Sequence, residues 1–175
     1  MRIACVIDDG FEDSEFSEPA RALRGAGHEL TLIGLRPGKR ISGKRGEVSA
    51  AIDRSIEEVQ PEDFDVLFIP GGYSPDHLRA NQGMVDFAAS FVRDDKPVLA
   101  ICHGPQLLLS ADVVKGRRMT AYKTIQVDLR YAGADVVDEE VVIDRRLVTS
   151  RQPADLPAFV RESLALLQMA PVTVP

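Results

Sequence analysis

The chain has 175 residues, 45% of them apolar and 27% charged, and its formal net charge is -6. These values predict one globular domain with a real hydrophobic core over residues 1–170, followed by a short tail at 171–175. The acidic balance argues against nucleic acid as the main partner, and no apolar run is long enough to cross a membrane.

Buried strands and helices alternate through the first half of the chain. The apolar run at residues 3–7 predicts a first strand at residues 2–7, which leaves no room for a signal peptide. A helix is expected from about Asp13, with Pro19 delaying or kinking it. The elements expected after it are a strand at 30–35, a basic loop or hairpin at 36–46, a strand at 48–52, a connector at 56–63, a strand at 66–69 and a helix at 84–93.

An apolar run at 98–101 and a helix from Pro105 follow, and the pattern then changes to shorter elements. Those expected are strands near Met119 and at 136–137, 141–143 and 147–149, a helical piece at 125–131 and a closing helix at 154–167. The alternation predicts an α/β fold with a mainly parallel sheet. Ligands bind beyond the carboxyl ends of the strands in such sheets, which selects the loops at 9–12, 71–73 and 102–103.

Cys102 lies between the apolar run and the helix, with the small residues Ala100 and Gly104 two positions away on either side. This spacing is the pattern of a nucleophile elbow with cysteine in place of serine. The beginning of the following helix favours negative charge, so we expect a lowered thiol pKa. Cys5 and Cys102 do not make a disulfide framework, and a free reactive thiol fits the reducing cytoplasm.

Three neighbours of Cys102 are candidates for catalysis. Backbone N–H groups at Gly72 and His103 would form an oxyanion hole, although Gly71-Gly72 alone also fits a simple turn. Glu12 would hydrogen-bond to the thiol, the alternative being helix capping. His103 would act as a base only if its ring folds back onto the thiol.

Other motifs do not support a function. Residues 38–44 spell G-x-x-x-x-G-K, but Arg45 replaces the Ser or Thr of a phosphate-binding loop. The basic residues of this region are interpreted as a solvated hairpin: Arg36, Lys39, Arg40, Lys44 and Arg45. Cys102 and His103 lack the spacing of metal ligands, so no metal or cofactor is expected. The absence of a later histidine argues against class I glutamine amidotransferase chemistry.

The combined motifs resemble the PfpI family, in the superfamily of the Parkinsonism-associated deglycase. They are Phe11-Glu12-Asp13, Pro70-Gly71-Gly72, the stretch from Ala100 to Pro105 and Thr120-Ala121-Tyr122. The likeness extends from Arg2 to about Leu167. The stretches at 72–79 and 149–157 are most similar to the YhbO-like bacterial stress-protein branch.

The resemblance implies a flavodoxin-like three-layer sandwich and the roles of several residues. It implies Cys102 as nucleophile, Glu12 bonded to it, His103 beside it, and Gly72 and His103 as oxyanion donors. It also implies Tyr122 near the site, and we expect Gly71 and Tyr73 in the same pocket. In peptidase members a glutamate of the neighbouring subunit completes a Cys-His-Glu triad, and the matching residue here is the shorter Asp76.

The function expected from this resemblance is a cysteine-dependent deglycase or glutathione-independent glyoxalase in stress protection. Its substrate would be methylglyoxal or an early adduct on a protein side chain, and the protein would be a homodimer or a hexamer. Two alternatives stay open: an intracellular cysteine peptidase, and a non-catalytic redox-sensing or chaperone-like stress protein.

Overall fold

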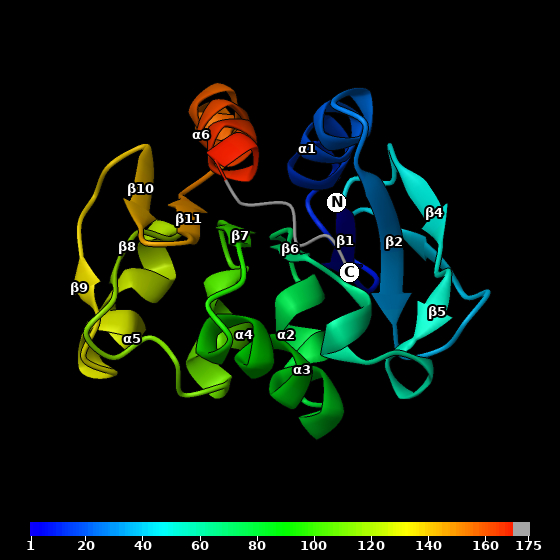
Figure 1. Ribbon diagram of the computed structural model, residues 1–175, viewed down its shortest axis with the longest axis horizontal. Helices are drawn as coiled ribbons and strands as arrows, with labels where there is room; N and C mark the ends of the chain where they lie inside the picture. Colours follow the sequence, from blue (N-terminus) through cyan, green and yellow to red (C-terminus); the bar gives the residue numbers. More distant parts are fainter. Residues whose placement is uncertain (170–175) are drawn as a thin grey trace.

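A computed structural model describes residues 1–169, and a seven-stranded sheet runs through its centre (Figure 1). Neighbouring strands are parallel, except that β10 is antiparallel to β11. In spatial order the strands are β10 (Val141–Asp144), β11 (Leu147–Ser150), β7 (Val98–Ile101), β6 (Val66–Ile69), β1 (Arg2–Val6), β2 (Glu29–Gly34) and β5 (Arg54–Ser55).

Helices cover both faces of the sheet and make a three-layer sandwich. Figure 1 shows α1 (Asp13–Gly25) and α6 (Leu156–Met169) on one face. The other face carries α2 (Ser74–Leu78), α3 (Gln82–Arg93) and α4 (Pro105–Ser110). The central strands lie in the order β2, β1, β6, β7 and β11, which is flavodoxin-like, as the family resemblance implied.

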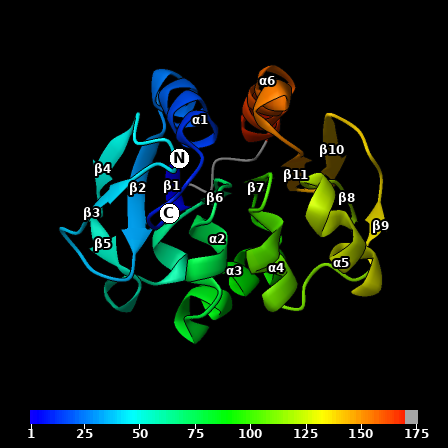
Figure 2. The same ribbon diagram turned by 180° about the vertical axis from the view of Figure 1, so that it is seen from behind.

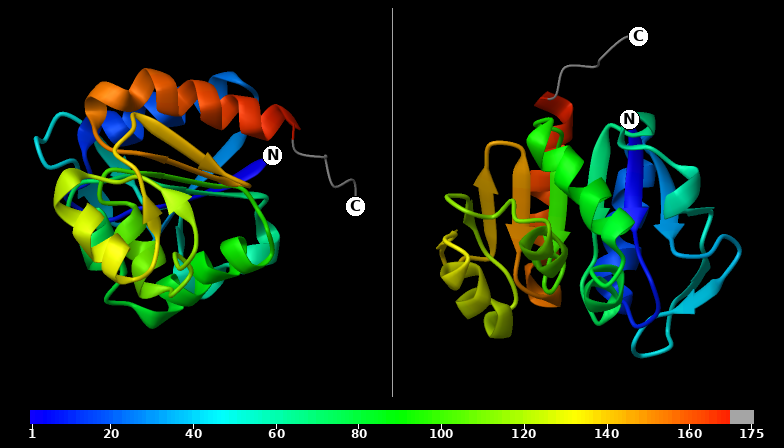
Figure 3. Two further views of the ribbon diagram at one scale, coloured as in Figure 1. Left: turned by 90° about the vertical axis from the view of Figure 1, so that its left-hand side faces the viewer. Right: turned by 90° about the horizontal axis from the view of Figure 1, so that it is seen from below.

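The strands are buried on both faces, which explains their continuous apolar runs. In β1, Ala4 and Val6 face the side of α3 and α4, whereas Ile3 and Cys5 face α1 and α6 together with Phe159. The left view of Figure 3 shows α6 lying along its face of the sheet. Each face therefore has its own hydrophobic core, and Cys5 is a fully buried member of one of them.

Smaller elements extend both ends of the sheet. The hairpin of β3 (Arg40–Ser42) and β4 (Ser49–Ala51) lies at the opposite end from α5 (Gln126–Tyr131), β8 (Arg118–Met119) and β9 (Asp135–Val136), as Figure 2 shows. Residues 1–169 also contain four short 3-10 helices: Ile56–Glu58, Pro61–Asp63, Lys123–Ile125 and Pro153–Asp155.

Pro19 does not delay the first helix, although the sequence predicts that it either delays the helix or kinks it. Helix α1 begins at Asp13 and continues through Pro19 to Gly25. Its ring is buried and lines a small cavity together with Leu99 and Phe159, where α1 meets α6 and the sheet. Burial of the ring offsets the backbone hydrogen bond that proline cannot donate.

The expected tail at 171–175 lies outside the described residues, and none of the helices within them is long and apolar enough to cross a membrane.

Candidate active site

Cys102 occupies a strained turn between β7 and α4. Its φ is 61°, a left-handed conformation that is uncommon for residues other than glycine and is concentrated at functional sites. Two backbone hydrogen bonds fix the turn: Cys102 donates to the carbonyl of Ser150 at 2.9 Å and accepts from the N–H of Tyr122 at 2.9 Å. A Cβ at Gly104 would press on the carbonyl oxygen of Ile69 at 2.5 Å, which explains the small residue there.

The loop after β6 brings backbone N–H groups to the sulfur. Gly72 has a φ of 83°, and its N–H and that of His103 both face the Cys102 thiol. At Gly71 a Cβ would collide with the Glu15 carboxyl and with the Cβ of Cys102. The glycine pair is therefore required for the close approach of this loop, and both amides favour negative charge on the sulfur.

The carboxyl group beside the thiol is that of Glu15, and the expectation that Glu12 bonds to the thiol is wrong. The Glu15 side chain points from the first turn of α1 toward Cys102 and Gly71 and is fully buried. Neither carboxyl oxygen has a hydrogen bond of ordinary geometry. Burial raises the pKa of Glu15 to about 8, aided by the charge of Glu12 and opposed by the thiol. The carboxyl is therefore protonated at neutral pH.

The pKa of the Cys102 thiol is raised, whereas the sequence predicts a lowered one. Burial raises the pKa of Cys102, and the negative charge of an ionised Glu15 raises it further. The N–H groups of Gly72 and His103 act in the opposite direction. Desolvation outweighs the short following helix, and protonation of Glu15 removes the repulsive charge.

Glu12 faces two cations rather than the thiol. Its carboxylate lies 2.5 Å from Nζ of Lys44 and 3.7 Å from Nε of Arg45. Glu12 precedes α1 by one residue, so it projects from a different side of the backbone than Glu15, nearly one helical turn later. It still lines the same pocket as Cys102.

His103 folds back onto the thiol, with Nδ1 3.2 Å from Sγ of Cys102. Its ring stacks on Tyr122 at a centroid distance of 4.9 Å, and Nε2 lies 3.5 Å from the hydroxyl of Thr124. Burial lowers the pKa of His103, the charge of Lys44 lowers it further, and Asp76 raises it. A neutral imidazole in this position can accept the proton of the thiol.

Asp76 lies on α2 at the edge of the site. Its carboxylate is exposed and lies 3.8 Å from Nε of Arg79 in the same helix. Within residues 1–169 no hydrogen bond joins it to His103, although its charge acts on that ring. Its expected role in a neighbouring subunit stays a prediction.

These residues open into a pocket of about 530 Å³. Of the expected residues, it is lined by Glu12, Gly72, Tyr73, Cys102, His103 and Tyr122. The lining residues that were not expected at the site from the sequence are Glu15, Lys44, Arg45, Gln152 and Pro153. Gly71 lies behind the thiol, where it makes room for Glu15.

Of the missed residues, Glu15 could have been identified from the sequence pattern, whereas Lys44 could not. Glu15 is spaced four and eight residues from Pro19 and Leu23, so a carboxyl stands on an otherwise apolar helix face, which was a detectable signal. Lys44 belongs to the region interpreted as a solvated hairpin. It reaches the pocket because Phe11 bridges to Gly43, a long-range pairing that no local pattern encodes.

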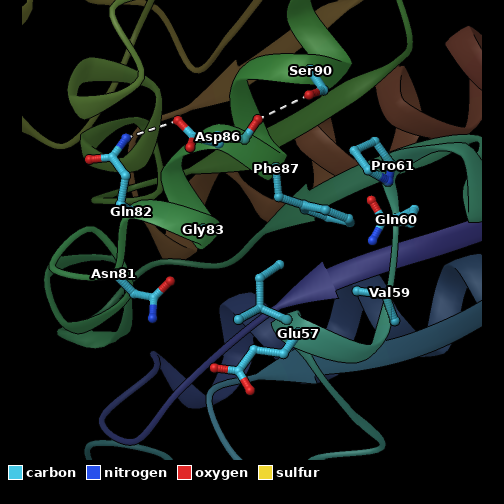
Figure 4. Close-up of a pocket in the computed structure, with 11 residues that line it drawn as sticks. Glu57, Val59, Gln60, Pro61, Asn81, Gln82, Gly83, Asp86, Phe87 and Ser90 are labelled. Carbon is cyan, nitrogen blue, oxygen red and sulfur yellow. Dashed lines mark hydrogen bonds between the residues drawn. The ribbon is translucent and has the colours of Figure 1, made fainter.

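A second pocket, of about 580 Å³, lies between the connector after β5 and α3 (Figure 4). Gln82 donates to the carboxylate of Asp86 at 2.8 Å, and the hydroxyl of Ser90 donates to the Asp86 carbonyl at 3.0 Å. Its lining contains neither cysteine nor histidine. Among residues 1–169, no group of three or more His, Cys, Asp or Glu side chains is arranged to hold a metal ion.

Comparison with known proteins identifies relatives over almost the whole chain. The family model described as "DJ-1/PfpI family" matches residues 1–166. Over 167 residues the chain is 56% identical to "Protein/nucleic acid deglycase 2" of Escherichia coli (strain K12), which covers 95% of this chain and 97% of the relative. It is 55% identical over 168 residues to "General stress protein 18" of Bacillus subtilis (strain 168), with coverage of 95% and 98%.

A solved structure from Anabaena variabilis, a two-domain protein with DJ-1/ThiJ/PfpI-like and ferritin-like domains, matches with a TM-score of 0.93 and 37% identity. The match covers 99% of this chain and 50% of that protein, so the chain spans half of its length.

Proposed function

Because the chain belongs to the DJ-1/PfpI family, we propose that it is a cysteine-dependent enzyme that acts on methylglyoxal or on its early adducts with protein side chains. The relatives named as a deglycase and as a general stress protein support a deglycase activity in stress protection. The finer assignment, to methylglyoxal without glutathione, is our proposal.

One arrangement carries this proposal: the Cys102 sulfur lies between a protonated Glu15, the His103 ring and two backbone N–H groups. A thiolate formed here is stabilised by hydrogen bonds from Gly72, His103 and Glu15. The same two amides are suitably placed to receive the oxygen of an attacked carbonyl.

The chemistry balances without a cofactor. The Cys102 thiolate adds to the aldehyde carbon of methylglyoxal, and the resulting oxyanion takes up a proton to give a hemithioacetal. A base removes the proton from the former aldehyde carbon, and the former ketone carbon is protonated. The aldehyde carbon is thereby oxidised and the ketone carbon is reduced. The product is a lactoyl thioester on Cys102, and water hydrolyses it to lactate and the free thiol.

His103 is the proposed base. Its neutral imidazole contacts the sulfur through Nδ1, and its stacking on Tyr122 holds the ring toward the pocket. When the thiolate forms, the protonated Glu15 can donate a hydrogen bond to it, and it is well placed to return a proton to the sulfur after hydrolysis.

The test is lactate formation from methylglyoxal by the wild type and by Cys102→Ala. We expect the substitution to reduce turnover to the uncatalysed background, whereas Cys5→Ala, a matched change at the buried second cysteine, keeps most of it. Lactate formation by Cys102→Ala at the wild-type rate would overturn the proposal. Wild-type protein without turnover would instead favour a redox-sensing or chaperone-like role.

A cysteine peptidase is the second candidate, because the contact between Sγ and Nδ1 at 3.2 Å is also that of a Cys-His nucleophile pair. Cleavage of small peptides that is lost in Cys102→Ala would support it. The exposed Asp76, engaged with Arg79, is a weaker third group than a glutamate that reaches His103.

A further inference from the structure

The loop at residues 43–48, here called the cation loop, is fixed against the active-site pocket by the buried Asp13. One Asp13 carboxylate oxygen accepts the N–H groups of Glu47 and Val48 at 2.9 and 2.8 Å. The other accepts the N–H of Arg45 at 3.0 Å. These bonds hold the pKa of Asp13 below its ordinary value even though burial acts to raise it. The loop is therefore preorganised around an ionised carboxylate.

Two further backbone features place Lys44 over the pocket. Its N–H donates to the carbonyl of Phe11 at 2.8 Å, next to the bridge between Phe11 and Gly43. A Cβ at Gly43 would collide with the Asp13 carboxylate, so the loop can approach this closely only with glycine at this position. The side chains of Lys44 and Arg45 then line the same pocket as Cys102.

The ammonium group of Lys44 has hydrogen-bond donors that its ion pair does not use. Its ammonium group carries three donors, and its one ion pair among the described residues is with Glu12, at 2.5 Å. Its side chain is 38% exposed, whereas Glu12 is 7% exposed, and Lys44 lines the open pocket. Arg45 lies 3.7 Å from the same Glu12 carboxylate.

The charges of the pocket lining favour a negative ligand. With Glu15 protonated and the thiol neutral, Glu12 is the one anion left among the described residues of the lining, and it faces two cations. Arg45 also pairs with Glu47 outside the pocket, at 3.2 Å, which leaves Lys44 as the cation most available to a ligand. A carboxylate bound there would accept a charge-assisted hydrogen bond from the ammonium group.

We propose that Lys44, supported by Arg45, forms a carboxylate-binding subsite beside Cys102 that takes short 2-hydroxycarboxylates and related anions. The ligand identity rests on the proposed function, in which a neutral dicarbonyl becomes an anionic hydroxy acid. Methylglyoxal offers no charge to Lys44, whereas lactate does. The subsite therefore retains the product and makes small carboxylates competitive inhibitors.

A purely structural role for Lys44, in which it only neutralises the buried Glu12, makes a different prediction. Loss of Lys44 would then disturb the pocket for charged and uncharged ligands alike. The two roles are separated by comparing a carboxylate with its neutral amide of the same shape, lactate with lactamide.

The experiment measures protection of Cys102 against alkylation by iodoacetamide, an uncharged reagent, at constant ionic strength. Sodium lactate and lactamide are titrated against the wild type, Lys44→Gln and the charge-conserving Lys44→Arg. Lys39→Gln is the matched control, because Lys39 lies in the same hairpin but pairs with Asp8 and Asp9 at 2.6 and 2.9 Å, outside the pocket.

We expect lactate to protect the wild type at a lower concentration than lactamide. In Lys44→Gln the half-protecting concentration of lactate should rise about tenfold to a hundredfold, while that of lactamide stays within about twofold. Lys44→Arg should restore most of the preference, and Lys39→Gln should retain it.

Equal protection of the wild type by the two ligands, or an equal shift for both in Lys44→Gln, would overturn the proposal. Absence of protection by either ligand would overturn it as well. This readout does not require turnover, so a protein that binds lactate as predicted but makes none from methylglyoxal would retain the subsite and lose the proposed function.

Discussion

Opposing influences act on the proton of Cys102. Burial and an ionised Glu15 disfavour the thiolate, whereas the amides of Gly72 and His103 favour it. Because burial also keeps Glu15 protonated, the carboxyl repels the thiolate less and becomes able to donate a hydrogen bond to it. Glu15 is therefore expected to set the reactivity of the thiol.

Substitutions at Glu15 test this expectation. Glu15→Gln keeps an uncharged donor, whereas Glu15→Leu removes the donor from the sulfur. We expect Glu15→Leu to lower the rate of Cys102 alkylation at pH 7 by about tenfold to a hundredfold, because a hydrogen bond to a charged group is lost. Glu15→Gln should retain more of the rate.

Glu12→Leu is the matched control for these variants, because Glu12 lines the pocket but pairs with Lys44. Its effect on alkylation should be smaller than that of Glu15→Leu. If Glu15→Gln and Glu15→Leu reduce the rate equally, hydrogen-bond donation by Glu15 is not its role.

Glu15 also makes the stability of the fold depend on pH. Its pKa is about 8 in the folded protein against an ordinary value of 4.5, so between these values the folded state holds a proton that the unfolded state has released. Stability conferred by this group is therefore lost as the pH rises from 4.5 to 8, by about 2–5 kcal/mol in total.

Urea unfolding of the wild type and of Glu15→Gln at pH 5, 6, 7 and 8 measures this contribution. The amide does not titrate, so the stability of the variant relative to the wild type should increase with pH over this range. Parallel stability curves for the two proteins would show that Glu15 is ionised in the folded state.

At the scale of elements, the site depends on how closely the β6 loop approaches the turn after β7. In Gly71→Ala the new methyl group meets the Cβ of Cys102 at 2.6 Å, and the backbone or the turn must move. We expect a loss of about 1–3 kcal/mol in the free energy of unfolding together with a slower alkylation of Cys102.

Gly25→Ala is the matched control, because Gly25 lies in α1 and a Cβ there has no neighbour within 4 Å. It should leave stability unchanged or raise it by up to about 1 kcal/mol. The measurement is the urea midpoint of unfolding of each variant, which should be lower for Gly71→Ala than for Gly25→Ala. Equal midpoints for the two variants would contradict the packing described at Gly71.

The main elements could be predicted from the sequence, because buried parallel strands read as continuous apolar runs. β6 and β7 coincide with the runs at 66–69 and 98–101, and the carboxyl-end rule then placed Cys102, Gly72 and the loop after β1 together. These features follow from local patterns and from a general rule of sheet topology.

Other features could not be predicted, because they depend on distances between remote segments. The choice between Glu12 and Glu15 depends on which side of the α1 start faces the sheet. The position of Lys44 depends on the bridge from Phe11 to Gly43, and the raised thiol pKa depends on the depth of burial. A periodic pattern reports none of these quantities.

At the scale of the whole molecule, the role predicted for Asp76 would link catalysis to assembly. We predict a homodimer or a hexamer in which Asp76 of one subunit lies near His103 of another. In mixtures of Cys102→Ala and Asp76→Ala subunits, a mixed dimer then contains one complete site. Statistical mixing should restore about a quarter of the wild-type activity, although each variant alone is poorly active.

The mixing experiment also separates this model from its alternative. If Asp76 acts on His103 of its own chain, no mixed dimer contains a complete site, and activity stays at the level of the separate variants. A monomer with full activity at micromolar concentration, observed by analytical ultracentrifugation, would contradict the assembly model directly.

The measurement that tests the central claim most directly is to trap the intermediate on Cys102. The wild type is mixed with isotopically labelled methylglyoxal, quenched in acid during turnover and mapped by peptide mass spectrometry. The account predicts a labelled lactoyl thioester on the peptide that contains Cys102 and none on that of Cys5, lost at a rate that matches lactate release. Lactate release with no label on Cys102 at any time would contradict it.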